Sequence, residues 1–240
     1  MHESGRLLAV VPARGGSKRL PRKNVLPLGG RPLISWTIAA AQASGVFDDI
    51  LVSTDDEEIA NVARDAGALV PWLRPANLCT DTATSAAVLQ HALAWYELER
   101  GVVNAVVLLQ PTSPFRRDAS IREAVASFRE QREPQAQAVV SVSPAPQHPA
   151  WCFYVDGTAM QPFLGWDNLQ QRSQDLPPAF ALNGAIYVMP AALVRSGAPL
   201  LQPGTRPFVM ADPTEALDID TEDDWQTAQM LAERLAGEQR

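Results

Sequence analysis

Short apolar runs alternate along this chain with segments whose apolar residues recur at helical spacing, and this alternation constrains the fold most. Leu7 to Val11, Asp49 to Ser53 and Ala105 to Leu109 predict buried strands, and the first two predicted helices end at Gly45 and Gly67. Repeated strand and helix units favour an α/β fold with a mainly parallel sheet flanked by helices. Such sheets bind ligands beyond the carboxyl ends of their strands. The length of 240 residues suits one domain of this kind.

The second half of the chain continues the pattern. Strands are predicted at Ala138 to Val142, at Ala185 to Val188 and near Phe208, and Leu69 and Val70 are predicted to begin another strand in the first half. Several polar residues stand where helices should begin. The predicted helix caps are Asp55 or Asp56, Thr84 or Ser85, and Thr221. The core is expected to return with the strand at Ala185 to Val188.

Residues 143–182 depart from the alternation and are predicted to form an insertion. This stretch is rich in proline, and alternation at Cys152 to Val155 indicates a hairpin strand. It also concentrates aromatic residues, including Trp151, Phe153, Phe163 and Trp166. An apolar protrusion of this kind needs a covering surface. We therefore expect the insertion to be a dimerisation subdomain of a homodimer.

Composition excludes several classes of protein. Two cysteines, Cys79 and Cys152, are too few for a disulfide framework, and no apolar run approaches the ~20 residues that span a bilayer. The N-terminal residues lack the pattern of a signal peptide. The net charge of −7 argues against binding to nucleic acid. We expect a cytoplasmic protein with no membrane or nucleic-acid partner.

The positive charge is concentrated near the N-terminus. No acidic residue lies between Glu3 and Asp48, and the only two lysines of the chain are Lys18 and Lys23, all other basic residues being arginine. Both lysines belong to the segment 13–24, which follows the first predicted strand and contains Gly15 and Gly16. Glycines let backbone amides approach phosphate oxygens, and lysine supplies a compact charge. The segment predicts a phosphate-binding loop, although it matches neither the P-loop nor the dinucleotide-binding pattern.

Six segments in the same order closely resemble the acylneuraminate cytidylyltransferases, and the resemblance covers essentially the whole chain. They are the loop at 12–24, Ser53-Thr54-Asp55-Asp56-Glu57-Glu58, Leu73-Arg74-Pro75, Leu109-Gln110-Pro111-Thr112-Ser113-Pro114-Phe115-Arg116, Asn183-Gly184-Ala185-Ile186-Tyr187 and Asp218-Ile219-Asp220-Thr221. The resemblance implies a Rossmann-like nucleotidyltransferase fold and a dimer. It also implies transfer of CMP from CTP to a nonulosonic (sialic-type) acid, with Mg²⁺ as cofactor.

The resemblance also implies roles for individual residues. The predicted CTP-binding residues are Arg14, Ser17, Lys18, Lys23, Asn24, Arg74 and Ser85. The predicted acceptor-binding residues are Gln110, Asn183, Tyr187 and Arg172. Asp218 and Asp220 are the predicted magnesium ligands. Arg14, Lys18 and Lys23 would stabilise the leaving pyrophosphate, and Asp220 would accept the proton of the attacking hydroxyl.

Elementary chemistry supports part of this assignment and leaves alternatives open. At a strand end, Asp218 and Asp220 share one face, which suits a magnesium ion completed by phosphate oxygens. Asp220 could instead serve only as a helix cap. The segment at 53–56 fits a turn and cap better than a second metal site. Gln110 could satisfy its own backbone, and Tyr187 could belong to the core.

The acceptor is less specified than the reaction. Gln110-Pro111-Thr112-Ser113-Pro114 resembles the N-acylneuraminate and legionaminate branch more than the pseudaminate branch, while Arg19-Leu20-Pro21 is similar to enzymes for octulosonate. Trp151 stands near the position where some neuraminate enzymes have a lysine for the glycerol tail, which favours an apolar tail as in legionaminate. Pseudaminate and octulosonate remain alternatives. A catalytically inactive nucleotide-binding regulator of the same fold is a further alternative.

Overall fold

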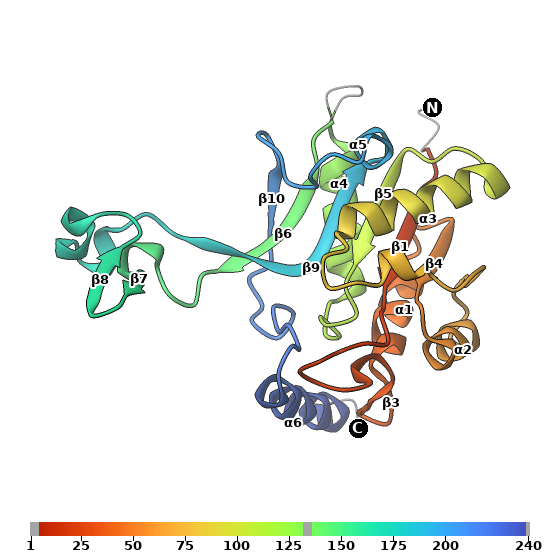
Figure 1. Ribbon diagram of the computed structural model, residues 1–240, viewed down its shortest axis with the longest axis horizontal. Coiled ribbons are helices and arrows are strands. Elements are labelled where there is room, and N and C mark those ends of the chain that lie inside the picture. Colours follow the sequence, from red (N-terminus) through yellow and green to blue (C-terminus); the bar gives the residue numbers. More distant parts are fainter. Residues whose placement is uncertain (1–4, 132–135, 239–240) are drawn as a thin grey trace.

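A computed structural model describes residues 5–131 and 136–238. Its centre is a six-stranded sheet with the order β10-β6-β9-β5-β1-β4 (Figure 1). The strands are β1 (Leu7–Pro12), β4 (Asp49–Ser53), β5 (Ala105–Leu109), β6 (Val139–Pro144), β9 (Phe180–Pro190) and β10 (Arg206–Val209). Only β9 runs against its neighbours β5 and β6, and the other pairs are parallel. The predicted mainly parallel sheet is confirmed.

Helices cover both faces of the sheet. They are α1 (Leu33–Ser44), α2 (Glu57–Asp65), α3 (Ser85–Arg100), α4 (Asp118–Arg129) and α5 (Ala191–Ser196). The last helix, α6 (Glu222–Glu238), packs at one end of the sheet. Leu7, Ala9 and Val11 of β1 join the core with α1, α2 and α4, whereas Leu8 and Val10 join the core with α3 and α5. Successive side chains of a strand point to opposite faces, so a strand buried on both sides must be apolar throughout. This requirement explains the uninterrupted apolar run of β1.

A third apolar cluster lies at one end of the sheet, where α6 packs. Trp225 of α6 contacts a group that includes Leu20, Phe115 and Ile219, all of them buried. These three residues come from three segments far apart in the sequence: the basic loop, the loop after β5 and the Asp-Ile-Asp segment. The cluster therefore holds together the segments in which the predicted site residues lie.

Several predicted helix ends are confirmed. The side chain of Asp56 accepts from Ile59 N at 3.0 Å at the start of α2, and Thr84 accepts from Ala87 N at 3.2 Å at the start of α3. Gly45 follows α1 with φ 63°, a left-handed conformation that glycine adopts without strain. Thr221 Oγ1 accepts from Asp224 N at 3.2 Å and begins α6. Of the alternatives that the sequence left open, Asp56 rather than Asp55 caps α2, and Thr84 rather than Ser85 caps α3.

Other predictions about the strands were wrong in extent. Leu69 forms a single bridge with Leu51 and no strand begins there. β9 starts at Phe180 rather than at Ala185, because it runs out of the core alongside β6. The short helix α5 and the hairpin of β2 (Pro27–Leu28) and β3 (Arg31–Pro32) were not predicted. These elements are too short to give a periodic pattern.

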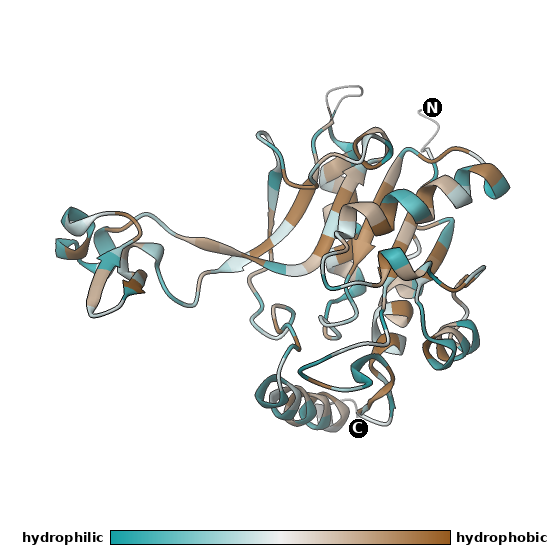
Figure 2. Ribbon diagram, in the orientation of Figure 1, coloured by the Kyte–Doolittle hydropathy of each residue, from teal (hydrophilic) through white to brown (hydrophobic). Residues whose placement is uncertain are grey.

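Residues 145–179 form an arm that projects from the sheet at the ends of β6 and β9 (Figure 1). Its tip contains the hairpin of β7 (Phe153–Asp156) and β8 (Ala159–Pro162), where the sequence indicated a strand. Figure 2 shows apolar residues concentrated along the central strands, whereas the arm mixes apolar and polar residues. Phe163 and Trp166 are 63% and 59% exposed. Within residues 5–131 and 136–238, no helix has the length and apolarity to cross a membrane.

Candidate active site

A cavity of about 500 Å³ lies at the carboxyl ends of β1 and β5. The chain passes from β1 to β4 on one side and later to β5 on the other, so the cavity lies where the strand order reverses. All seven residues predicted to bind CTP line this cavity: Arg14, Ser17, Lys18, Lys23, Asn24, Arg74 and Ser85. Gln110 and Asp220 line it as well. The structure thus brings the basic loop, the start of α3 and the C-terminal segment together.

The basic loop is fixed to the sheet at its base. Gly15 N donates to Asp55 Oδ1 at 2.9 Å, and Asn24 Nδ2 donates to Arg14 O at 3.0 Å. A Cβ atom at Gly15 would lie 2.8 Å from Asp56 Oδ2, so only glycine fits this close approach. Asp55 and Asp56 therefore shape the loop and cap α2, as the turn-and-cap interpretation expected.

Two cations of the loop are paired with a carboxylate that sequence analysis missed. Arg14 Nη1 donates to Asp81 Oδ1 at 2.7 Å, and Lys18 Nζ donates to Asp81 Oδ2. The side chains of Arg14, Lys18 and Asp81 are 40%, 78% and 52% exposed. These contacts lower the pKa of Asp81 below its ordinary value, with the Lys18 hydrogen bond as the largest cause. Asp81 is one acidic residue in a polar loop, and no spacing signal distinguishes it.

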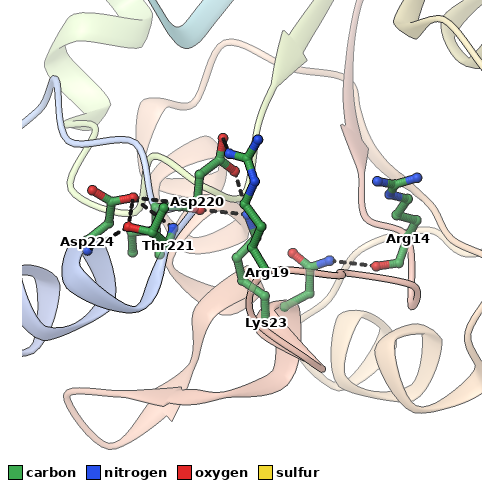
Figure 3. A network of polar contacts seen from close by, with 8 residues as sticks. Arg14, Arg19, Lys23, Asp220, Thr221 and Asp224 are labelled. Carbon is green, nitrogen blue, oxygen red and sulfur yellow. Dashed lines mark hydrogen bonds and ion pairs between the residues drawn. The ribbon is translucent and has the colours of Figure 1, made fainter. Parts of the chain in front are cut away.

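Lys23 has a different environment from Lys18. Its Nζ donates to Ile219 O at 2.6 Å and to Asp220 Oδ1 at 2.9 Å (Figure 3), and only 11% of its side chain is exposed. Arg22, which precedes it, has φ 57°, an uncommon conformation for a residue with a side chain. Arg19 approaches the other Asp220 oxygen at 4.0 Å. Lys23 therefore links the basic loop directly to the predicted metal-binding segment.

Arg74 is a second buried cation that, like Lys23, joins separate segments of the site. Its Nε donates to Ser53 Oγ at 3.0 Å and its Nη2 to Ser53 O, which anchors the guanidinium on the end of β4. Burial lowers the pKa of Arg74 from its ordinary value. Ser85 is the first residue of α3, directly after the cap at Thr84. Both residues line the cavity, Arg74 anchored by its hydrogen bonds to Ser53 and Ser85 by its place at the start of a helix.

Asp218 and Asp220 flank the fully buried Ile219 in the sequence. Asp220 lines the larger cavity, whereas Asp218 lies outside both sets of cavity-lining residues. The expectation that they stand at a strand end was wrong, because β10 ends at Val209 and the segment follows as irregular backbone. Asp218 keeps contact with solvent, but the surrounding protein removes part of its hydration and raises the pKa of its carboxyl. The negative charge of Asp220 also raises that pKa, so the two carboxylates repel each other. A divalent cation would relieve this repulsion. Two oxygen ligands are a suitable donor set for magnesium when substrate phosphates supply the remainder.

Gln110 and Tyr187 line a second cavity of about 300 Å³ together with Leu108, Leu200 and Leu201. Gln110 and Ser85 line both cavities, so the two spaces adjoin. A Cβ atom at Gly184, where φ is +73°, would lie 2.8 Å from Gln110 Oε1 and 3.9 Å from Asp218 Oδ2. The glycine thus leaves room for the glutamine side chain beside the carboxylate.

Two predicted acceptor residues lie outside both sets of cavity-lining residues. The amide of Asn183 accepts from Ser141 Oγ at 2.5 Å and donates to Ser143 Oγ at 2.8 Å, which stabilises the irregular pairing of β6 and β9. Arg172 belongs to the arm. A direct contact of either residue with an acceptor stays a prediction.

Comparison with known proteins agrees with this geometry. A family model described as Cytidylyltransferase matches residues 8–235. The chain is 40% identical over 230 residues to a CMP-N,N'-diacetyllegionaminic acid synthase of Legionella pneumophila, covering 95% of this chain and 97% of that protein. The chain belongs to the cytidylyltransferase family. The family expected from the sequence motifs is confirmed, and the chain is a nucleotidyltransferase.

Two further comparisons define the range of similar proteins. A pseudaminic acid cytidylyltransferase of Campylobacter jejuni is 33% identical over 224 residues, covering 93% of this chain and 95% of that protein. A solved structure of a CMP:2-keto-3-deoxy-manno-octonic acid synthetase complexed with CTP aligns with a TM-score of 0.71 at 18% identity, covering 95% of this chain and 99% of the other. The structural likeness confirms the nucleotidyltransferase fold. The similar proteins are named for different sugars, so family membership alone does not identify the acceptor sugar of this chain.

Proposed function

We propose that this cytidylyltransferase transfers CMP from CTP to the anomeric hydroxyl of a nonulosonic acid and releases pyrophosphate. The observation that carries the proposal is the adjoining pair of cavities that share Gln110 and Ser85. The larger cavity has the cations that a triphosphate requires. The smaller has an amide and a phenol beside leucines, which suits a polar sugar with apolar substituents.

In the proposed reaction the acceptor hydroxyl attacks the α-phosphorus of CTP, the bond to the pyrophosphate oxygen breaks, and pyrophosphate leaves. Arg14 and Lys18 would exchange Asp81 for phosphate oxygens and stabilise the negative charge that leaves. Asp220 would take the hydroxyl proton. Asp218 and Asp220 would hold Mg²⁺, which neutralises phosphate charge and makes the hydroxyl more acidic when it is bound.

The reaction is tested by measuring pyrophosphate release with CTP, Mg²⁺ and a panel of acceptors. The panel contains N,N'-diacetyllegionaminate, N-acetylneuraminate, pseudaminate and octulosonate, and ATP, GTP and UTP replace CTP as controls. We expect release with CTP and with a nonulosonic acid, fastest with the legionaminate type because leucines line the acceptor cavity. Equal release from all four nucleotides, or none with any acceptor, would contradict the proposal.

We propose further that the enzyme works as a homodimer built on the arm. Apolar side chains gather on the arm and on the adjoining ends of β6 and β9, where solvent contact is unfavourable. The exposed apolar residues of this region are Tyr154, Val155, Met160, Phe163, Leu164, Trp166, Phe180 and Leu182. Because the arm projects from the body (Figure 1), Arg172 would serve the acceptor site of the second copy.

Light scattering of two variants tests the dimer. Phe163→Ser combined with Trp166→Ser should shift the protein toward a monomer at micromolar concentration. Leu98→Ser is the matched control, because Leu98 is 82% exposed on α3 outside the arm and its change should leave the mass unaltered. A wild-type monomer at the same concentration would remove the proposal. Localisation in the cytoplasm stays a prediction.

A further inference from the structure

Arg116, in the loop between β5 and α4, is a buried charge that the catalytic scheme does not use. It is 2% exposed, and three of its nitrogens donate to uncharged oxygens. Burial lowers the pKa of Arg116 to about 9, with the charge of Glu215 opposing the shift, so the guanidinium remains cationic at neutral pH. A buried cation without a carboxylate bonded to it is costly, so its hydrogen bonds to other groups should explain why it is there.

Those contacts join the ends of two neighbouring strands. Nη2 donates to Gln110 O at 2.6 Å and Nε donates to Ala185 O at 2.8 Å. The register of β5 and β9 ends at the pair Leu109 and Ile186, so Gln110 and Ala185 are the first residues beyond it. The guanidinium therefore bridges the strands at the point where their own pairing stops. Hydrogen bonds from a charged donor are stronger than neutral ones, which suits this task.

The bridge lies directly behind the acceptor side of the site. The side chain of Gln110 lines both cavities, and its Oε1 lies over Gly184, the residue before Ala185. Thr37 of α1 supports the same point, since its Oγ1 lies 3.5 Å from Gln110 O and 3.4 Å from Arg116 Nη1. Arg116 thus contacts the backbone on both sides of the space that the Gln110 amide occupies.

We propose that Arg116 is a positioning residue, whose guanidinium fixes the backbone of Gln110 and Ala185 and thereby aims the Gln110 amide at the acceptor. The inference rests on the proposed function for what the amide binds. A purely structural arginine would affect nucleotide and acceptor alike. Loss of a positioning residue should affect the acceptor more than the nucleotide, because the Gln110 amide serves the acceptor cavity while Arg116 itself is not among the residues that line the nucleotide cavity.

The test compares Arg116→Lys, Thr37→Val and the control Arg117→Lys. Lysine keeps the charge but cannot reach three oxygens in a fork. Arg117 is the neighbouring arginine, 60% exposed and paired with Glu215 instead of the strand ends. We expect Arg116→Lys to lower kcat/KM for the acceptor by about 10- to 100-fold, as for a misplaced binding group. The Kd for CTP from titration calorimetry should stay within about threefold.

Thr37→Val removes one hydroxyl with little change of shape and should lower kcat/KM for the acceptor by a few-fold. Arg117→Lys should leave acceptor kinetics and CTP affinity unchanged. Unaltered acceptor kinetics in Arg116→Lys would overturn the proposal, and so would a parallel loss of CTP affinity and acceptor use.

A second readout does not depend on turnover. The NMR signals of the Gln110 side-chain amide should shift in Arg116→Lys, while those of the Asn24 amide in the basic loop stay in place. An unmoved Gln110 signal would overturn the positioning role whatever the acceptor is. If the wild type releases no pyrophosphate with any acceptor while the Gln110 signal moves, the proposed function fails and the positioning role stands.

Discussion

The two walls of the larger cavity are built in different ways. The cation wall, residues 13–24 with Arg74, presents Arg14 and Lys18 on exposed side chains held by Asp81. The carboxylate wall is formed by the segments 110–115 and 218–220, of which Gln110, Pro111, Thr112 and Asp220 line the cavity. It is supported by buried groups, among them Ile219 and Glu215. Exposed ion pairs contribute little to stability and exchange partners readily, whereas buried contacts fix geometry. One wall can therefore release its cations to a triphosphate while the other keeps its ligands in place.

Lys23 is the exception that joins the walls. It belongs to the cation wall by sequence, but its Nζ contacts Ile219 O and Asp220 Oδ1 on the opposite wall. The third apolar cluster joins the same segments through Leu20, Phe115 and Ile219. We therefore expect substitutions in the carboxylate wall to lower the reaction rate most. In the cation wall, substitution of the buried Lys23 should lower stability as well, whereas substitution of an exposed cation should weaken only CTP binding.

The largest expected effect comes from the carboxylate wall. Asp218→Asn and Asp220→Asn should each leave a folded protein and lower the rate of pyrophosphate release by about 10²-fold or more, as for loss of a preorganised charge. The deficit should shrink as magnesium is raised, because an amide is a weaker ligand for the metal. If Asp220 also accepts the proton, its variant should keep a deficit at saturating metal. Rates are measured over a magnesium titration.

Asp223→Asn is the control for the Asp pair. Asp223 is an exposed carboxylate in the first turn of α6, close in sequence to the pair but not among the charged groups that shift the pKa of Asp218. Its variant should retain normal rate and magnesium dependence. Normal activity of both Asp218→Asn and Asp220→Asn at low magnesium would place the metal elsewhere.

The two lysines test whether burial separates members of the cation wall. Lys23→Ala should lower both the rate, by about 10-fold or more, and the stability, by about 1–3 kcal/mol, because it leaves Ile219 O and Asp220 without their donor. Lys18→Ala should weaken CTP affinity and leave Tm unchanged, since Lys18 is mostly exposed. Thermal unfolding and CTP titration distinguish the variants. Equal Tm values for both would refute the difference between the lysines.

Glu215 tests the support of the carboxylate wall. Its carboxylate accepts from Arg117 N at 2.9 Å and from Ser120 Oγ at 2.6 Å, and the residue is 2% exposed. Glu215→Gln should cost about 1–3 kcal/mol of stability, because the amide has one accepting oxygen and its NH2 group would face a hydrogen-bond donor. Denaturant unfolding measures the loss. Glu222→Gln, on the exposed first turn of α6, should cost less than about 0.5 kcal/mol, and a similar loss in both would remove the anchoring role.

The sequence predicted the cation wall better than the groups that support the site. Glycines and lysines in one loop carry a compositional signal. The pattern Asp-Ile-Asp indicated the paired carboxylates, although the strand end expected there is absent, since β10 ends at Val209. Arg116 and Glu215 carry no such signal, because their partners are backbone atoms and side chains 69 and 98 residues away. By sequence, Lys23 is a loop lysine with no sign that its side chain is buried. Arg22, directly before it, has a left-handed backbone conformation with φ 57°, and no local sequence pattern predicts a turn of this kind.

The smallest expected effect concerns His91, which lies behind the cation wall. Its ring centroid is 4.6 Å from that of Trp72, and desolvation, followed by repulsion from Arg74, lowers the pKa of His91 in the folded protein. The unfolded chain then binds a proton that the folded chain resists, so stability falls as pH drops through the ordinary histidine pKa and into the folded one. His91→Gln should remove this part of the slope. Above that window, the pH dependence should be unchanged.

Bound CTP should change the pH dependence of stability that His91 causes. A triphosphate beside Arg74 would offset the positive charge that repels a protonated His91, so the fall of stability at acid pH should be shallower with CTP present. Thermal unfolding between pH 5 and 8, with and without CTP, compares wild type with His91→Gln. If the variant shows the wild-type slope in both conditions, His91 is not coupled to the cation wall. A slope that CTP leaves unchanged in wild type would instead place the triphosphate away from Arg74.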